Sequence, residues 1–291
     1  MDSHLFLELI LSMSDVTSYP PLLAIDAGNS RIKFGLFQPG SMPPDAPSFP
    51  ECAEFLAIPV DDPIPRAELL RWTNQGVVGA VISGSNPPVI QRLLDSWDLG
   101  PTPLDVRSCS SIPIVAKVDF PERVGLDRLL NAVAVNALRP SSRPAIVVDS
   151  GTATTVDYVS STGEFCGGAI LPGMELSAKA LHLYTALLPL LPVQELGAGP
   201  SVPGRNTRDA IRNGLFWGQV GAIRELIRQL CVQQGHQIPE SATDGNQDAP
   251  WLVLTGGGGP VLSPQFPAAT RVASLGMHGL VLTAWKSRVM S

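Results

Sequence analysis

Two short polar turns, one in each half of the sequence, carry residue types that handle phosphate. The first follows the apolar run that ends at Asp26 and contains Gly28, Asn29 and Ser30, and the second follows the run that ends at Asp149. In each, backbone N–H groups can hold phosphate oxygens while the carboxylate holds a hydrated Mg²⁺. One such turn is typical of an ordinary hairpin. Two in the same register of each half favour phosphate binding.

A glycine run, Thr255–Gly259, follows a short apolar run and offers a third backbone surface that a nucleoside could approach closely. Alone it is weak support, because a glycine cluster is usually a flexible turn. The sequence has no Gly-x4-Gly-Lys-Ser/Thr and no Gly-x-Gly-x-x-Gly that opens a helix after a strand. The P-loop and Rossmann interpretations therefore lose their main support. The interpretation that remains is an actin-like ATPase.

The elements that position these turns recur along the chain. Leu22–Phe37 predicts a strand, a tight turn and a strand, and Ala145–Val159 repeats this pattern just after a proline-rich stretch. We therefore expect duplicated α/β domains with the phosphate chemistry in their shared cleft. Residues 1–20 form an unstructured or mis-assigned extension in this interpretation, residues 21–143 the N-terminal domain and residues 144–291 the C-terminal domain.

Hydrophobic periodicity fills in the rest of each half. Helices are expected at 88–97, 125–138, 174–186, 207–233 and 275–285, and further strands at 77–83, 164–171 and 251–254. Thr207 or Asn206 could cap the long helix. The interval 38–65 is rich in Pro, Ser and Asp, so we expect loops there with at most a short strand near 55–60.

Composition narrows the class of protein. The 291 residues are 44% hydrophobic and 16% charged with a net charge of -6, which predicts a globular protein and disfavours nucleic-acid partners. The four cysteines form no Cys-x-x-Cys pair, so we expect free thiols in a reducing cytoplasm. No continuous apolar stretch is long enough for a membrane helix, and the N-terminal residues lack the features of a signal peptide, so we expect no membrane partner.

A series of motifs, in order along the chain, resembles the type III pantothenate kinases. These motifs are DAGNSRIKFGLF from Asp26, PERVGLDR at Pro121–Arg128, DSGTATTVD at Asp149–Asp157, GGAILPG at Gly167–Gly173, TALLP at Thr185–Pro189, NTRDAIRNG at Asn206–Gly214 and LTGGGG at Leu254–Gly259. The GLDR element together with DSGTATT separates this family from other members of its superfamily. The resemblance implies two ribonuclease-H-like (actin-like ATPase) domains and transfer of the γ-phosphoryl of ATP to pantothenate, the first step of coenzyme A biosynthesis.

The same resemblance implies roles for matching residues. Asp127 would be the general base, and Asp149 would bind a monovalent cation, K⁺ or NH₄⁺. Asp26 would lie near Mg²⁺. The ATP-binding residues would be Asp26, Ala27, Gly28, Asn29, Ser30, Arg31, Ile32, Lys33 and Thr152, and the pantothenate-binding residues would be Gly125, Leu126, Asp127, Arg128 and Thr207.

Other interpretations stay open for some of these positions and for the whole chain. Asp127 and Arg128 could form a surface ion pair at a helix start, and Thr207 could simply cap a helix. Val118 departs from the family, in which many members have Tyr. The family also implies a homodimer. A non-catalytic transcription accessory factor, or another small-molecule phosphotransferase of the same superfamily, is the alternative function.

Overall fold

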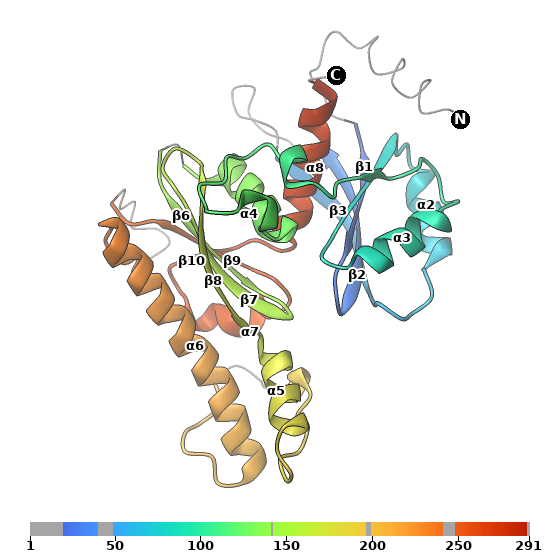
Figure 1. The fold of residues 1–291 in the computed structure, drawn as a ribbon. Coiled ribbons are helices and arrows are strands. Elements are labelled where there is room, and N and C mark those ends of the chain that lie inside the picture. The colour runs from blue at the N-terminus through green and yellow to red at the C-terminus, as the bar shows by residue number, and fades with distance from the viewer. Residues whose placement is uncertain (1–19, 40–48, 141, 196–198, 241–247, 290–291) are drawn as a thin grey trace. The chain divides into compact units, whose positions relative to one another are not determined.

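The computed structural model describes residues 20–39, 49–140, 142–195, 199–240 and 248–289 (Figure 1). The predicted N-terminal extension lies outside these residues except for Pro20. The chain forms two compact units. Unit 1 contains residues 1–113, 122–137 and 276–291, and unit 2 contains residues 114–121 and 138–275.

Unit 1 is built on a five-stranded sheet with the order β3-β2-β1-β4-β5. Strand β1 pairs antiparallel with β2 and parallel with β4, so only the hairpin side of the sheet is antiparallel. Leu23, Ile25 and Ile82 of the central strands pack with Leu69 and Leu93 from two covering helices. In chain order the elements are β1 (Leu22–Ala27), β2 (Arg31–Pro39), β3 (Pro50–Pro59), α2 (Arg66–Thr73), β4 (Gly79–Ser83), α3 (Pro87–Asp95), β5 (Leu104–Asp105), α4 (Leu126–Leu138) and α8 (Leu275–Val289).

Unit 2 repeats this sheet, with the order β10-β9-β6-β7-β8 and the same strand directions. Its core joins Val148, Val156 and Leu254 of the sheet to Phe216 and Ile223 of the long helix. Helices α5 and α6 lie side by side (Figure 1). In chain order the elements are β6 (Ala145–Ser150), β7 (Ala153–Val159), β8 (Phe165–Pro172), α5 (Met174–Leu183), α6 (Thr207–Gln234), β9 (Trp251–Thr255), α7 (Gly259–Leu262) and β10 (Ala269–Arg271).

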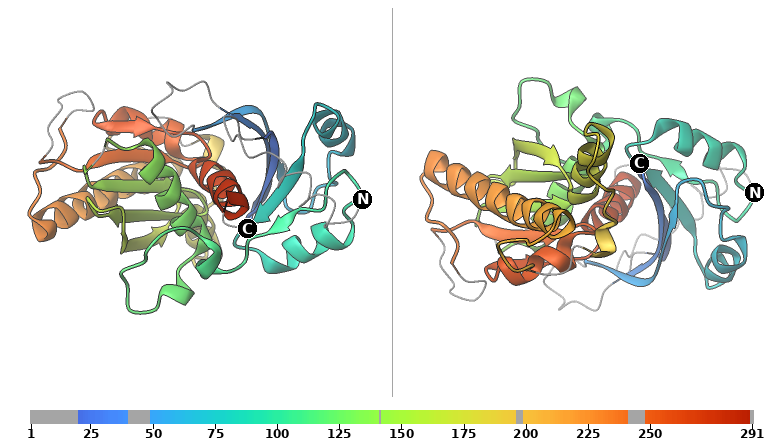
Figure 2. Two further views of the ribbon diagram at one scale, coloured as in Figure 1. Left: turned by 90° about the horizontal axis from the view of Figure 1, so that it is seen from above. Right: turned by 90° about the horizontal axis from the view of Figure 1, so that it is seen from below.

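The shared strand order confirms the predicted duplication of an α/β domain. The last helix departs from the expected domain division. Residues 144–291 were expected to form one domain, but α8 groups with unit 1. In both views of Figure 2, α8 (red) lies beside the blue strands of unit 1. A Cβ added at Gly279 of α8 would lie only 1.9 Å from the Leu130 carbonyl oxygen of α4, so glycine permits this close packing. His278 Nδ1 also lies 3.0 Å from the Pro50 carbonyl oxygen of β3.

Strand β3 is the main departure from the predicted elements. It runs from Pro50 to Pro59, in an interval expected to be mostly loop, and pairs antiparallel with β2. The expectation of only a short strand was wrong because prolines are tolerated at an edge, where one side of the strand needs no ladder partner. Helix α2 (Arg66–Thr73) and the three-residue strand β10 also went unpredicted.

Candidate active site

The first polar turn joins β1 to β2 in unit 1. The Gly28 N–H donates to the Arg31 carbonyl oxygen at 3.0 Å and closes the turn. Asp26 and Lys33 are direct partners in the antiparallel ladder, and Lys33 Nζ lies 2.7 Å from Asp26 Oδ2. Both side chains keep part of their surface exposed, 27% for Asp26 and 38% for Lys33. The turn therefore presents a carboxylate and an ammonium group together at the end of β1.

A second loop packs against this turn, between β4 and α3. The Asn86 N–H donates to the Ala27 carbonyl oxygen at 3.2 Å, and Asn29 Nδ2 donates to Ser85 Oγ at 3.3 Å. Gly84 has a φ of +152°, and a Cβ there would lie 2.2 Å from the Ala27 carbonyl oxygen. Only glycine allows the loop to approach the turn this closely.

Unit 2 places its turn in the same way between β6 and β7. The Gly151 N–H donates to the Ala153 carbonyl oxygen at 3.0 Å. Asp149 is the ladder partner of Thr155 on β7 and of Thr255 on β9. The Thr155 hydroxyl is buried and, in the part of the chain that the structure describes, has no hydrogen-bond partner. A carboxylate here is flanked by hydroxyl groups rather than by a lysine.

The glycine run closes over the unit 2 turn just as the β4–α3 loop closes over its counterpart. The Gly258 N–H donates to the Ser150 carbonyl oxygen at 2.8 Å. A Cβ at Gly256, whose φ is +85°, would lie 2.4 Å from Asp149 Oδ1 and 2.4 Å from the Ser150 carbonyl oxygen. The run therefore fixes the surroundings of the Asp149 carboxylate.

Sequence reasoning singled out this run but missed its counterpart in unit 1. Each loop starts with a hydroxyl residue at a strand end, Ser83 or Thr255, and continues with a left-handed glycine. Each also has a proline four residues after that glycine, Pro88 or Pro260. This shared pattern was the available signal. The intervening segments differ so much in length that no fixed repeat spacing reveals it.

Asp127 lies in the first turn of α4, which begins at Leu126. Its side chain is exposed, and Oδ1 accepts a hydrogen bond from the Arg128 N–H at 2.9 Å. A Cβ at Gly125 would lie 2.5 Å from that same oxygen, so glycine leaves room for the carboxylate. Partial positive charge at a helix start favours an anion at this position. Asp127 is thus an accessible, ionisable acceptor on a rigid element.

Thr207 is the first residue of α6, and its side chain is exposed. The cap is the preceding residue, because Asn206 Oδ1 accepts the Asp209 N–H at 2.9 Å. Of the two candidates for the cap, the structure therefore selects Asn206. Thr207 is therefore not the residue that caps α6.

The predicted site residues divide between the units. Asp26 to Lys33 and Gly125 to Arg128 belong to unit 1, whereas Asp149, Thr152 and Thr207 belong to unit 2. Within the described ranges no group of three or more His, Cys, Asp or Glu side chains could hold a metal ion. Beside the Asp149 carboxylate in the ladder are the hydroxyl groups of Thr155 and Thr255. That set fits a weakly charged hard cation better than a transition metal.

A family profile described as type III pantothenate kinase matches residues 22–229. The chain belongs to this family. The type III pantothenate kinase of Gluconobacter oxydans is 35% identical over 276 residues, covering 90% of this chain and 92% of that protein. The enzyme of Sphingopyxis alaskensis is 36% identical over 243 residues, covering 77% and 86%.

The match to the type III pantothenate kinase family takes in both polar turns, the start of α4 and the start of α6. Among solved structures, a Campylobacter jejuni protein assigned to the Baf family of transcriptional activators aligns with a TM-score of 0.54 and 19% identity, covering 91% of this chain and 98% of that one. This likeness shows a shared fold. In the described part of the chain, no helix is both long and apolar enough to cross a membrane.

The four cysteines agree with the expectation from their spacing. Cys52, Cys109, Cys166 and Cys231 are all free thiols, so the protein has no disulfide.

Proposed function

We propose that the chain transfers the γ-phosphoryl group of ATP to the primary hydroxyl of pantothenate, forming 4'-phosphopantothenate and ADP at the entry to coenzyme A biosynthesis. Family membership supports the reaction. The single observation that carries it in the structure is the exposed Asp127 carboxylate at the start of α4, directly after a glycine that leaves it room.

Asp127 acts as the general base in this proposal. Its carboxylate accepts the proton of the pantothenate hydroxyl as the hydroxyl oxygen forms a bond to the γ-phosphorus. The bond between that phosphorus and the β,γ-bridging oxygen breaks, and ADP leaves. Gly125, Leu126, Arg128 and Thr207 contact pantothenate, and the planar guanidinium of Arg128 suits its carboxylate.

The unit 1 turn and Thr152 hold the ATP phosphates. The Asp26–Lys33 pair places an ammonium group at the turn, where it can contact phosphate oxygens, while backbone N–H groups supply further donors. Asp26 would hold hydrated Mg²⁺, which would neutralise phosphate charge, and Lys33 contacts one oxygen of this carboxylate at 2.7 Å.

Asp149 and the buried Thr155 hydroxyl would hold a monovalent cation, K⁺ or NH₄⁺. The support is the Thr155 oxygen, which has no hydrogen-bond partner in the described residues, beside the carboxylate in the ladder. Such an ion supplies positive charge near the phosphates. Asp149 would fix the position of this ion.

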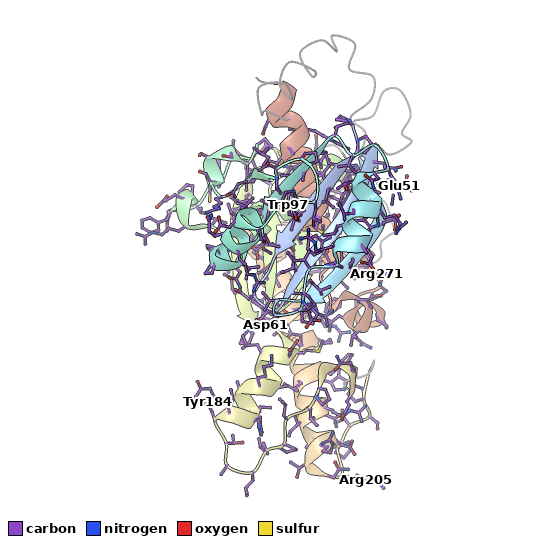
Figure 3. All side chains as sticks on the ribbon, turned by 90° about the vertical axis from the view of Figure 1, so that its right-hand side faces the viewer. Glu51, Asp61, Trp97, Tyr184, Arg205 and Arg271 are labelled. Carbon is purple, nitrogen blue, oxygen red and sulfur yellow. The ribbon has the colours of Figure 1, made fainter. Side chains whose placement is uncertain are left out.

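A cytoplasmic homodimer completes the proposal. The α5–α6 part of unit 2 exposes large apolar side chains, with Tyr184 87% and Leu187 91% exposed. Figure 3 shows Tyr184 projecting outward from the end of α5. Exposed apolar clusters of this kind mark interaction surfaces. Leu187→Asp should convert the dimer to a monomer in analytical ultracentrifugation, and a variant that sediments as the wild type would place the interface elsewhere.

The test of the reaction is ADP release from purified protein with ATP, Mg²⁺ and K⁺. Pantothenate is compared with no acceptor and with a panel of small hydroxylated acceptors. Release that requires pantothenate and increases with K⁺ supports the kinase. Release with a different acceptor would identify another phosphotransferase, and folded protein with no acceptor-dependent release would favour the regulatory alternative.

A further inference from the structure

The segment just before the general base passes from unit 1 to unit 2 and back, and we call residues 109–124 the excursion. Residues 109–113 group with unit 1, residues 114–121 with unit 2, and residues 122–137 again with unit 1. Asp127 follows soon after the return. The conformation of the segment that leads into α4 therefore depends on what holds the excursion at each end.

Its far end is attached to the edge strand β8 of unit 2. Ala116 forms a parallel bridge with Phe165, in which the Phe165 N–H donates to the Val115 carbonyl oxygen at 2.9 Å. The Lys117 N–H returns a bond to the Phe165 carbonyl oxygen at 2.8 Å. Two backbone bonds thus fix three residues of an otherwise irregular segment.

An ion pair reinforces this attachment. Lys117 Nζ lies 2.9 Å from Glu164 Oε1, and Thr162 Oγ1 donates to the second carboxylate oxygen at 2.9 Å. The hydrogen bond from Lys117 is the main reason that the pKa of the Glu164 carboxyl lies below its usual value. The Glu164 side chain is only 22% exposed. Because Thr162 in the turn before β8 also donates to it, this turn holds the carboxylate in position.

The near end of the excursion is closed within unit 1. Cys109 Sγ lies 3.4 Å from the Val124 carbonyl oxygen and 3.7 Å from the Glu122 carbonyl oxygen, and its single S–H is a weak donor that can reach either. Because its ends meet, the excursion resembles an Ω-loop. A change at the far end of such a loop, on β8, can affect the near end in unit 1 only if the far end is anchored.

We propose that Lys117 and Glu164 are positioning residues for phosphoryl transfer, which hold the excursion on β8 and so set the segment that carries Asp127. This inference rests on the proposed kinase function. Neither side chain needs to touch substrate, because both act through residues 118–126. Loss of the pair leaves only the two backbone bonds to hold the loop on β8, and the added conformational freedom lowers the fraction of molecules with Asp127 in place.

The experiment compares Lys117→Met and Glu164→Gln with Lys179→Met, which removes a similar exposed pair, Lys179–Glu175 at 2.9 Å, from α5 of the same unit. Steady-state kinetics gives kcat and KM for each substrate. For the first two variants we expect kcat/KM for pantothenate to fall roughly three- to fivefold, the upper range for an ion pair, with KM for ATP unchanged. Lys179→Met should match the wild type. The double exchange Lys117→Glu with Glu164→Lys should restore most of the loss.

Hydrogen exchange of backbone amides at 122–128 gives a second readout that needs no activity. Exchange should be faster in Lys117→Met and unchanged in Lys179→Met. Unchanged exchange, or equal losses for ATP and pantothenate, would overturn the positioning role. A wild-type protein without pantothenate-dependent ADP release would instead refute the kinase, and the exchange data would still decide whether the pair controls the Asp127 segment.

Discussion

The two polar turns share a backbone but differ in the residue opposite the carboxylate. In unit 1 the ladder partner of Asp26 is Lys33, which forms an ion pair with it, whereas in unit 2 the partner of Asp149 is Thr155. Both turns are closed by a glycine loop that donates an N–H to the residue after the aspartate. Duplication thus preserved the frame, and the side chains opposite the carboxylates allow the units to take different roles.

A second difference lies between the hairpin strands and the fourth strand of each sheet. Unit 1 has the eight-residue α2 there, whereas unit 2 has α5 and the 28-residue α6. The larger insertion carries Thr207 and the exposed apolar side chains around Tyr184. In the proposed function, unit 2 therefore combines a cation site with a surface for a second subunit, and unit 1 supplies the base.

The proposed function places proton transfer in unit 1, at Asp127, so the largest effect should follow loss of this residue. Asp127→Asn should lower kcat by roughly 10² to 10⁴, the range for a general base. The fold should persist because the side chain is exposed. Asp61→Asn, which alters another exposed carboxylate of unit 1 (Figure 3), is the control and should retain activity. Equal rates for Asp127→Asn and wild type would remove Asp127 from the mechanism.

The cation role assigned to unit 2 is tested by Asp149→Ala. Without the carboxylate the remaining Thr155 hydroxyl is too weak a ligand to hold a hard cation alone. ADP release should therefore lose its stimulation when K⁺ is titrated at constant ionic strength. The equivalent change in unit 1, Asp26→Ala, should leave the shape of the K⁺ titration unchanged. If Asp149→Ala responds to K⁺ as the wild type does, the two turns are not specialised in this way.

The shared frame depends on two left-handed glycines. Gly256→Ala in unit 2 and Gly84→Ala in unit 1 place a Cβ within 2.4 Å and 2.2 Å of a carbonyl oxygen. Each should lower the free energy of unfolding by about 1–3 kcal/mol, a typical strain for such positions. Gly257→Ala is the matched control, because a Cβ there meets nothing within 4 Å. Urea unfolding measures the difference, and equal stability of Gly256→Ala and Gly257→Ala would contradict the close approach.

The charge difference between the turns is tested by Lys33→Met. Removing the ammonium group should raise KM for ATP roughly ten- to a hundredfold, since a hydrogen bond to a charged group contributes about 1.5–3 kcal/mol. Lys33→Arg keeps the charge opposite Asp26, so its KM for ATP should lie between those of the wild type and Lys33→Met. The measurement is the initial rate over a range of ATP at saturating pantothenate. A KM for ATP that does not change would show that Lys33 serves only Asp26.

Much of this frame was predictable from the sequence. The two strand, turn, strand patterns and the long helix from Thr207 follow from hydrophobic periodicity and turn residues, which act locally. The edge strand β3 was not predictable in full, because its prolines argue for a loop and only the pairing with β2 overrides them. The grouping of α8 with unit 1 depends on contacts between residues far apart in sequence, such as Gly279 and Leu130.

The candidate site shows the same division. Motifs located the turns and Asp127, but the Lys33–Asp26 ion pair follows from strand register, which depends on the length of the turn. The Gly84 loop was missed because its repeat in unit 2 is displaced by the α5–α6 insertion. No local pattern marks the attachment of Lys117 to Glu164, because its two segments meet only in the folded chain.

The smallest expected effect concerns a buried thiol in the core of unit 2. Burial raises the pKa of the Cys231 thiol to about 11, against a usual value of 9.0. Below pH 9 the folded and unfolded chains both keep this proton, so the thiol does not make stability depend on pH. Above pH 9 the unfolded chain releases the proton while the folded chain retains it, so stability falls as pH rises toward 11. Between pH 9 and 10 this loss is about 1 kcal/mol.

Cys231→Val removes the ionisable group while keeping an apolar side chain of similar size. Its free energy of unfolding should therefore fall less than that of the wild type between pH 9 and pH 10, as measured by urea unfolding at each pH. Cys231 packs in the same cluster as Ile223 and Ile227 of α6. A slope identical to that of the wild type would show that the Cys231 thiol does not contribute to the pH dependence and that its pKa is not raised in the folded chain.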